Sequence, residues 1–296
     1  MEGGSALSIL LPAALFIIML GMGLSLNLSN FSRLIERPGV ILVGLIFQLF
    51  CLPVLAFILV TSFELSPALS VGLMIVSFAP GGATSNMISY LCRADTALSI
   101  TLTAISSLLV PLTLPWLAWL SLEYFMAQGV MINLPVITTI MKLLMVTIIP
   151  VLLGVMIHAR WPELSQTMQK PVKIISLIFM FSVVLLISWA NKEQLPELLP
   201  VLTPVVLLLS GGAMLMAVLL ARYLFKYSAE TALTLGIETG IQNAGTGLMI
   251  TGAILQQPEM SMSVLMYGIL MQIPALLLVI WRNLPQGNIV GSVNSQ

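Results

Sequence analysis

The chain has 296 residues, of which 59% are hydrophobic and 7% are charged, and its formal net charge is zero. Soluble domains carry about 25% charged residues, so this composition excludes a surface covered by water and predicts that lipid surrounds the chain. The neutral balance gives no support for a nucleic-acid partner.

In chain order, nine apolar stretches reach the roughly 20 residues that a membrane-spanning helix needs. We therefore predict an all-α polytopic membrane protein in which residues 1–296 form a single transmembrane domain. The expected spans lie near 7–28, 39–60, 68–91, 96–121, 132–158, 172–190, 198–225, 229–254 and 260–281.

Basic residues divide unevenly between the linkers on the two sides of these spans. One side carries Arg33, Arg37, Arg93, Arg160, Lys170, Lys173, Arg222, Lys226 and Arg282. The other side carries Lys192, while Lys142 lies inside the fifth span. Because basic linkers stay in the cytoplasm, we predict a multi-pass protein with its N-terminus outside and its C-terminus cytoplasmic.

The third and eighth spans have unusual sequences for membrane helices. The third contains Pro80-Gly81-Gly82, and the eighth contains Gly236 and Gly240. Such residues tolerate an unwound backbone, although Gly-rich helices that pack closely would show the same composition. The two spans run in opposite directions in the predicted topology, which is typical of an inverted-repeat transporter. Spans one to four would then match spans six to nine.

Glu238 is the one acidic residue deep in an apolar stretch. A charged residue at the bilayer centre costs about 2.5 to 3.5 kcal/mol on insertion scales, so it needs a compensating partner. A bound cation would compensate the charge, and a protonated Glu238 bonded to a neighbouring helix is the alternative.

Oxygen-bearing side chains accompany Glu238, and hard cations prefer oxygen ligands. One carboxylate among neutral oxygens suits a monovalent ion better than a divalent one. The accompanying residues are Gln48, Ser85, Asn86, Ser99, Thr103 and Gln242.

Residues 78–86, with the sequence FAPGGATSN, and 237–243, with the sequence IETGIQN, closely resemble the two signature segments of the bile acid:sodium symporter family. The resemblance covers essentially the whole chain and points to the nine-span bacterial members. It implies a core domain with two crossing broken helices, near 68–121 and 198–281. It also implies a panel domain, near 7–60 and 132–190.

The same resemblance implies two sodium sites and an anion site. Ser85, Asn86, Ser99, Thr103 and Glu238 would form the first sodium site. Gln48, Glu238, Thr239, Ile241 and Gln242 would form the second, with Thr239 and Ile241 offering backbone carbonyls. The anion would face Thr84, Asn243 and Gln272.

The expected function is therefore sodium-coupled symport of an organic anion by alternating access, in a bacterial inner membrane. The resemblance implies a bile acid-like anion or a small carboxylic acid such as pantoate, and a single copy of the chain would suffice. The alternative is a sodium/proton antiporter, which usually needs further carboxylates. We expect no enzyme, because His158 is the one histidine and lies at a span end.

Overall fold

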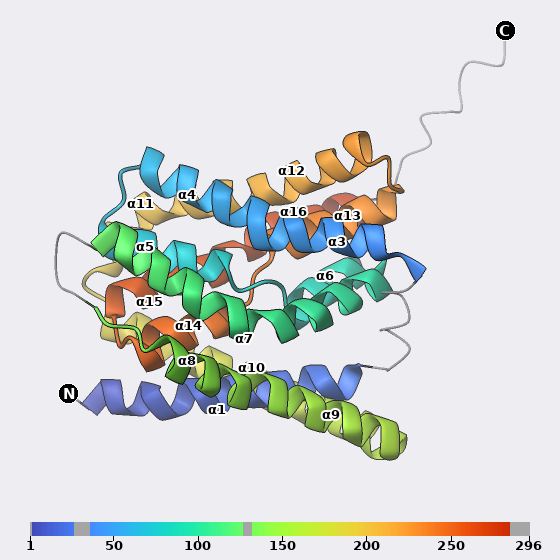
Figure 1. Ribbon diagram of the computed structural model, residues 1–296, viewed down its shortest axis with the longest axis horizontal. Helices are drawn as coiled ribbons and strands as arrows, with labels where there is room; N and C mark the ends of the chain where they lie inside the picture. The colour runs from blue at the N-terminus through green and yellow to red at the C-terminus, as the bar shows by residue number, and fades with distance from the viewer. Residues whose placement is uncertain (1, 27–35, 127–131, 285–296) are drawn as a thin grey trace, which may run out of the picture.

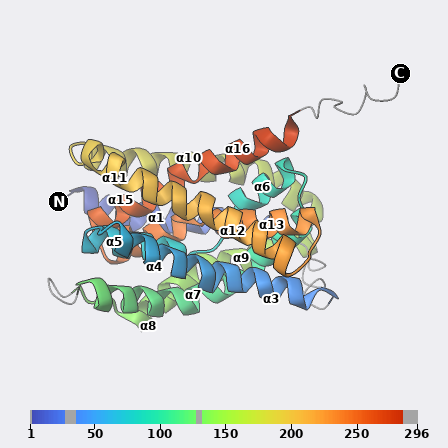
Figure 2. The ribbon, with the colours of Figure 1, turned by 90° about the horizontal axis from the view of Figure 1, so that it is seen from above.

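The computed structural model describes residues 2–26, 36–126 and 132–284, and every regular element within these ranges is a helix. The long helices run nearly parallel to a common direction in both views (Figure 1, Figure 2). Their length and apolar composition confirm the predicted all-α, multi-pass membrane protein.

Seven stretches in the described residues are uninterrupted and apolar over a length that crosses a membrane. They are formed by α1 (Glu2–Ser25); α3 (Pro38–Ile46), η2 (Phe47–Cys51) and α4 (Leu52–Ser62); α7 (Thr96–Met126); α8 (Val136–Leu143), η3 (Leu144–Ile148) and α9 (Ile149–Arg160); α10 (Pro162–Ala190); α11 (Leu195–Leu207), η4 (Leu208–Gly212), α12 (Ala213–Leu219) and η5 (Leu220–Leu224); and α15 (Pro258–Leu270) with α16 (Gln272–Asn283).

The two remaining predicted spans are each broken, so neither forms one helix long enough to cross a membrane, and the count of nine stays a prediction. The first is divided into α5 (Pro67–Ser77) and α6 (Ala83–Leu91). The second is divided into α13 (Ala229–Gly240), α14 (Ala244–Leu248) and the π-helical η6 (Met249–Ile254). Along the chain, the two broken spans run in opposite directions across the bundle (Figure 1).

Two π-helical turns bring polar residues into the interior of otherwise apolar spans. η2 and η3 each end two residues before a proline, Pro53 and Pro150. Proline lacks a backbone donor and its ring clashes with the preceding turn, and a widened turn relieves both effects. Gln48 lies on η2 and Thr147 on η3, and both side chains are buried.

The helix α1 packs mainly on η3–α9 and α10. A side-chain carbon at Gly154 would lie 2.6 Å from the Leu24 nitrogen and 2.7 Å from the Leu20 oxygen, so glycine allows α9 to contact the backbone of α1. These helices lie along one edge of the molecule (Figure 1). We call α1, α8–η3–α9 and α10 the α1 unit.

The span from α3 to α4, which the sequence grouped with the panel, packs on α5, α7 and α13. α5 packs on α15, and α13 lies beside α12 (Figure 2). These contacts place the α3–α4 span with the two broken spans and away from the α1 unit.

Two basic residues, Arg37 and Arg282, contact the turn that follows α6. Arg37, before α3, lies 3.7 Å from the Asp95 carboxylate in the turn after α6, and the Arg282 Nε of α16 donates to the Cys92 carbonyl at 3.2 Å. Arg33 lies outside the described residues. The side of the membrane on which this turn lies stays a prediction.

Candidate functional site

The two breaks in the broken spans touch each other at the centre of the bundle. The Asn243 backbone nitrogen donates to the Ala79 carbonyl at 2.8 Å. A side-chain carbon at Gly81 would lie 2.7 Å from Glu238 Oε2, so glycine lets this carboxylate approach the first break. We call residues 78–86 and 237–243 the crossing region.

Glu238 is completely buried and accepts hydrogen bonds from two other spans. Ser99 Oγ donates to its Oε1 at 2.5 Å, and Thr103 Oγ1 donates to its Oε2 at 3.1 Å, both from α7. Gln48 Nε2, from η2, donates to Oε2 at 3.2 Å. The Glu238 carboxylate is thus hydrogen-bonded by neutral donors from η2 and α7.

Asn86 brings a further acceptor to the same two hydroxyl groups. Its Oδ1 lies 2.7 Å from Ser99 Oγ and 3.3 Å from Thr103 Oγ1. A hydroxyl group has one proton to donate, so two hydroxyls cannot satisfy these four oxygen contacts at the same time. The excess of acceptor oxygens around one carboxylate fits a monovalent cation.

Ser85 lies beside this group, buried at the start of α6. Its Oγ donates to the Gly82 carbonyl at 2.8 Å, and it would lie 2.8 Å from a side-chain carbon at Gly81. The structure therefore brings together all five residues of the first predicted sodium site.

The second predicted group surrounds the last turn of α13. Gln48 Nε2 donates to the Glu238 carbonyl at 3.2 Å, and Gln242 Nε2 donates to the Thr239 carbonyl at 2.9 Å. The Oε1 atoms of both glutamines are buried without a hydrogen-bond partner. Buried acceptors normally have partners, so these two oxygens are free to bind a cation.

The backbone role expected for Thr239 and Ile241 agrees with their side chains. Thr239 Oγ1 is occupied, because it donates to the Leu235 carbonyl at 2.7 Å. Ile241 is buried and extended, at the point where α13 has ended. Both residues can therefore offer carbonyl oxygens to an ion.

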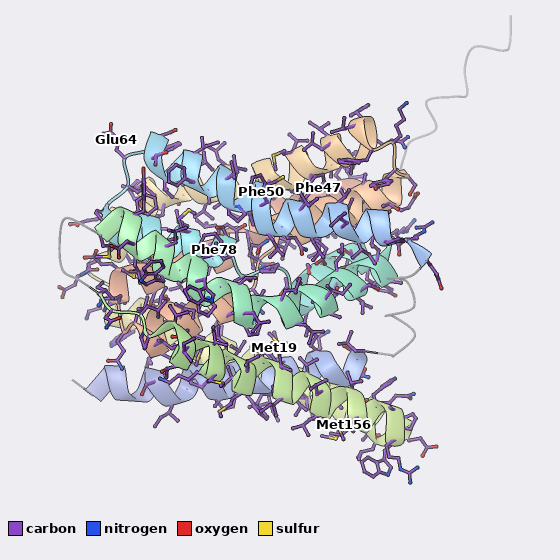
Figure 3. All side chains as sticks on the ribbon, in the orientation of Figure 1. Met19, Phe47, Phe50, Glu64, Phe78 and Met156 are labelled. Carbon is purple, nitrogen blue, oxygen red and sulfur yellow. The ribbon has the colours of Figure 1, made fainter. Side chains whose placement is uncertain are left out.

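The three predicted anion residues lie in different places. Asn243 lines a small cavity between the crossing region, α7 and the α1 unit, whereas Thr84 is exposed on α6 and Gln272 begins α16. Met19, which belongs to α1 and is labelled in Figure 3, also lines the cavity. The full lining is Met19, Pro80, Ser107, Val110, Pro111, Leu143, Thr147, Asn243 and Thr246.

Reasoning from the sequence missed three polar residues of this cavity, Ser107, Thr147 and Thr246. Ser107 continues the Ser99 and Thr103 face of α7 by one more turn, which was a usable signal. Thr147 precedes Pro150 by three residues inside an apolar span, as Gln48 precedes Pro53 by five. A polar residue that shortly precedes a proline inside an apolar span is thus the second signal for a functional position.

The chain matches one family of known proteins. The sequence model of the sodium bile acid symporter family matches residues 12–198. The uncharacterized sodium-dependent transporter YocS of Bacillus subtilis (strain 168) is 28% identical over 270 residues, which cover 90% of this chain and 78% of the relative.

Two eukaryotic relatives are longer than the matched region. The probable sodium/metabolite cotransporter BASS2, chloroplastic, of Oryza sativa subsp. japonica is 27% identical over 285 residues, which cover 93% of this chain and 64% of the relative. The sodium/bile acid cotransporter 4 of Homo sapiens is 32% identical over 193 residues, which cover 65% of this chain and 43% of the relative. The chain thus spans less than two thirds of the length of these two proteins.

Proposed function

Because the chain belongs to the sodium bile acid symporter family, we propose that it couples the inward movement of sodium to the uptake of an organic anion. The relatives are named as sodium-dependent transporters or cotransporters, which supports the sodium coupling. These names describe transporters and not enzymes. A bile acid-like anion and a small carboxylic acid remain the two substrate classes to test.

The observation that carries this proposal is the surplus of buried acceptor oxygens around Glu238. The carboxylate, the Asn86 amide and two partnerless glutamine oxygens face only neutral donors. We assign the first ion to Ser85, Asn86, Ser99, Thr103 and Glu238. We assign the second to Gln48, Glu238, Gln242 and the carbonyls of Thr239 and Ile241.

Alternating access needs two bodies that move against each other. We assign the α1 unit to the panel and the two broken spans, with α7, α11–α12 and α15–α16, to the core. The α3–α4 span joins the core, because Gln48 reaches Glu238 from η2 and the span packs on α5, α7 and α13. The cavity lies where these two bodies meet, because Asn243 of the crossing region and Thr147 of the α1 unit both line it.

Two sodium ions with one monovalent anion would carry one net positive charge inward. A potential of about 100 mV then contributes roughly 2.3 kcal/mol. Two tenfold sodium gradients contribute about 2.8 kcal/mol, since each factor of ten is worth about 1.4 kcal/mol. The sum supports an anion gradient of roughly three to four orders of magnitude.

The antiporter alternative has less support, because it requires groups that exchange protons. Among the described residues, Glu238 is the one acidic side chain in the buried set.

The experiment is uptake of radiolabelled organic acids into proteoliposomes. An inside-negative potential with sodium outside should raise accumulation, and a pH gradient without sodium should not. Sodium movement driven by a pH gradient alone, with no organic anion, would establish the antiporter.

The orientation can be tested separately from transport. We propose that the basic end of the bundle is cytoplasmic, with the N-terminus outside. A reporter fused after Arg282 should then behave as cytoplasmic, and an external location would reverse the orientation.

A further inference from the structure

Two buried hydroxyl groups outside both proposed sodium sites hold a single carbonyl at the end of α13. Ser210 Oγ, on η4, donates to the Gly240 carbonyl at 2.8 Å. Tyr267 Oη, on α15, donates to the same oxygen at 3.0 Å. Both side chains are completely buried. One backbone oxygen is therefore held from two separate helices.

The neighbouring carbonyls of α13 have different partners. The last turn of a helix leaves its carbonyls without intrahelical donors, so other groups must bind them. The Glu238 and Thr239 carbonyls accept from the Gln48 and Gln242 amides, which belong to the proposed second sodium site. The Gly240 carbonyl alone among these three is bound by groups outside that site.

The position of Gly240 is fixed by packing as well. A side-chain carbon at this residue would lie 2.6 Å from the Ser210 carbonyl oxygen and 2.9 Å from Met214 Cβ. The backbone of α13 therefore lies directly against η4 and α12. No other residue type fits here without a shift of one of these helices.

Holding this carbonyl also fixes the peptide plane from which the next residue leaves the helix. A peptide unit is planar, so a fixed Gly240 oxygen fixes the Ile241 nitrogen as well. That nitrogen donates to the Ile237 carbonyl at 2.9 Å. Ile241 then leaves the helix with φ −107° and ψ 110°. The direction of its carbonyl follows from the orientation of the Gly240 peptide together with these two angles.

We propose that Ser210 and Tyr267 are positioning residues of the second sodium site. By holding the Gly240 carbonyl away from the ion, they keep the carbonyls of Thr239 and Ile241 in the direction that binds sodium. Without them the Gly240 carbonyl lacks a partner and competes for the Gln242 amide or the ion. This inference rests on the proposed function and adds two residues that do not touch sodium themselves.

The test uses Tyr267→Phe, Ser210→Ala and the double variant of the full-length protein in detergent. The thermal midpoint is titrated with NaCl while choline chloride keeps the ionic strength constant, and binding of radioactive sodium is measured in parallel. Each single variant should raise the half-saturating sodium concentration about fivefold, the equivalent of one hydrogen bond, and the double variant more. Tyr267→Phe removes one oxygen atom and keeps the ring, so the packing of α15 stays intact.

Ser263→Ala is the matched control, because this buried serine lies one turn before Tyr267 on α15 and its hydroxyl has no hydrogen-bond partner. It should leave the sodium dependence unchanged. If both single variants lower the midpoint in sodium-free buffer but keep the wild-type sodium dependence, the hydroxyls are merely structural and the inference is wrong. A wild-type protein that sodium does not stabilise would refute the proposed function itself, and the inference with it.

Discussion

The crossing region and the α1 unit lie in one helical bundle but differ in their backbone structure. In the crossing region both spans are interrupted, and polar side chains from η2, α6 and α7 surround Glu238. In the α1 unit the helices are long, and they contact each other through glycine. Polar groups and open backbone at membrane depth are tolerated only where protein encloses them.

Burial differs between α7, which packs beside the crossing region, and α10 of the α1 unit. In α7, which supplies Ser99 and Thr103, 56% of the membrane-spanning window is buried, whereas in α10 of the α1 unit the share is 18%. The proposed ion ligands Ser99 and Thr103 therefore lie on the more enclosed of these two helices. Substitutions in the crossing region should change sodium binding, and substitutions at helix contacts within the α1 unit, away from the cavity, should change stability alone.

The largest expected effect is at Glu238. Glu238→Gln keeps the shape of the side chain but removes the charge that we propose binds both ions. Sodium-dependent uptake in proteoliposomes should fall roughly 100-fold or more, as expected when one partner of a buried charge pair is lost. Glu259→Gln, at the exposed start of α15, is the control and should transport normally. Normal sodium dependence in Glu238→Gln would remove Glu238 from the site.

The next effect concerns the stability of the α1 unit. Gly154→Ala places a carbon against the α1 backbone, so the free energy of unfolding should fall by about 1 to 3 kcal/mol, as overpacking typically costs. Thermal unfolding in detergent measures this loss, and the half-saturating sodium concentration should not change. Gly212→Ala is the control, because no atom lies within 4 Å of the added carbon. Equal stability of the two variants would contradict the tight helix contact.

A smaller effect on sodium binding is expected from a neutral ligand. Asn86→Ala removes the amide oxygen beside Ser99 and Thr103 but keeps the carboxylate. The half-saturating sodium concentration should rise about tenfold, because one uncharged ligand is lost. Ser89→Ala, a buried position on the same helix whose hydroxyl has no hydrogen-bond partner, should behave like the wild type. The assignment of Asn86 fails if both variants bind sodium equally well.

The smallest effect is expected from Ser165 in the α1 unit. Its Oγ donates to the Leu24 carbonyl at 2.9 Å and lies 3.1 Å from His158 Nδ1. Ser165→Ala should lower the free energy of unfolding by about 1 kcal/mol and leave uptake unchanged. Ser182→Ala is the control on the same helix, because that exposed hydroxyl bonds only to its own helix in the structure. A change in sodium dependence would show that the two regions are coupled.

Much of the candidate site was predictable because charged and Gly-Pro residues are rare in membrane helices. Glu238 was recognisable as the one acidic residue in an apolar stretch, and Pro80-Gly81-Gly82 marked a break. Seven of the expected spans correspond to uninterrupted apolar helices of sufficient length. The divided helices at the other two spans agree with the reading of their Gly-rich segments as breaks rather than as ordinary close-packed helices.

Ser210 and Tyr267 could not be recognised in the same way. Single hydroxyl groups occur in many membrane helices as bonds between neighbours, so their presence carries no information about the partner. Their common acceptor, the Gly240 carbonyl, lies 30 residues from Ser210 and 27 from Tyr267 in the sequence. The packing partners of the α3–α4 span could not be predicted either. Hydropathy indicates that a span enters the membrane, but it does not indicate which neighbouring helices the span contacts.

The sequence by itself determined the membrane environment, the helical class, the places where helices break and the carboxylate that needs a partner. These follow from hydropathy, backbone chemistry and the cost of burying charge, which are local properties. The tertiary structure decided which oxygens meet around Glu238, which helices enclose them and which hydroxyls hold the backbone beside them. Those contacts join residues that are far apart in the chain, and only packing in three dimensions selects them.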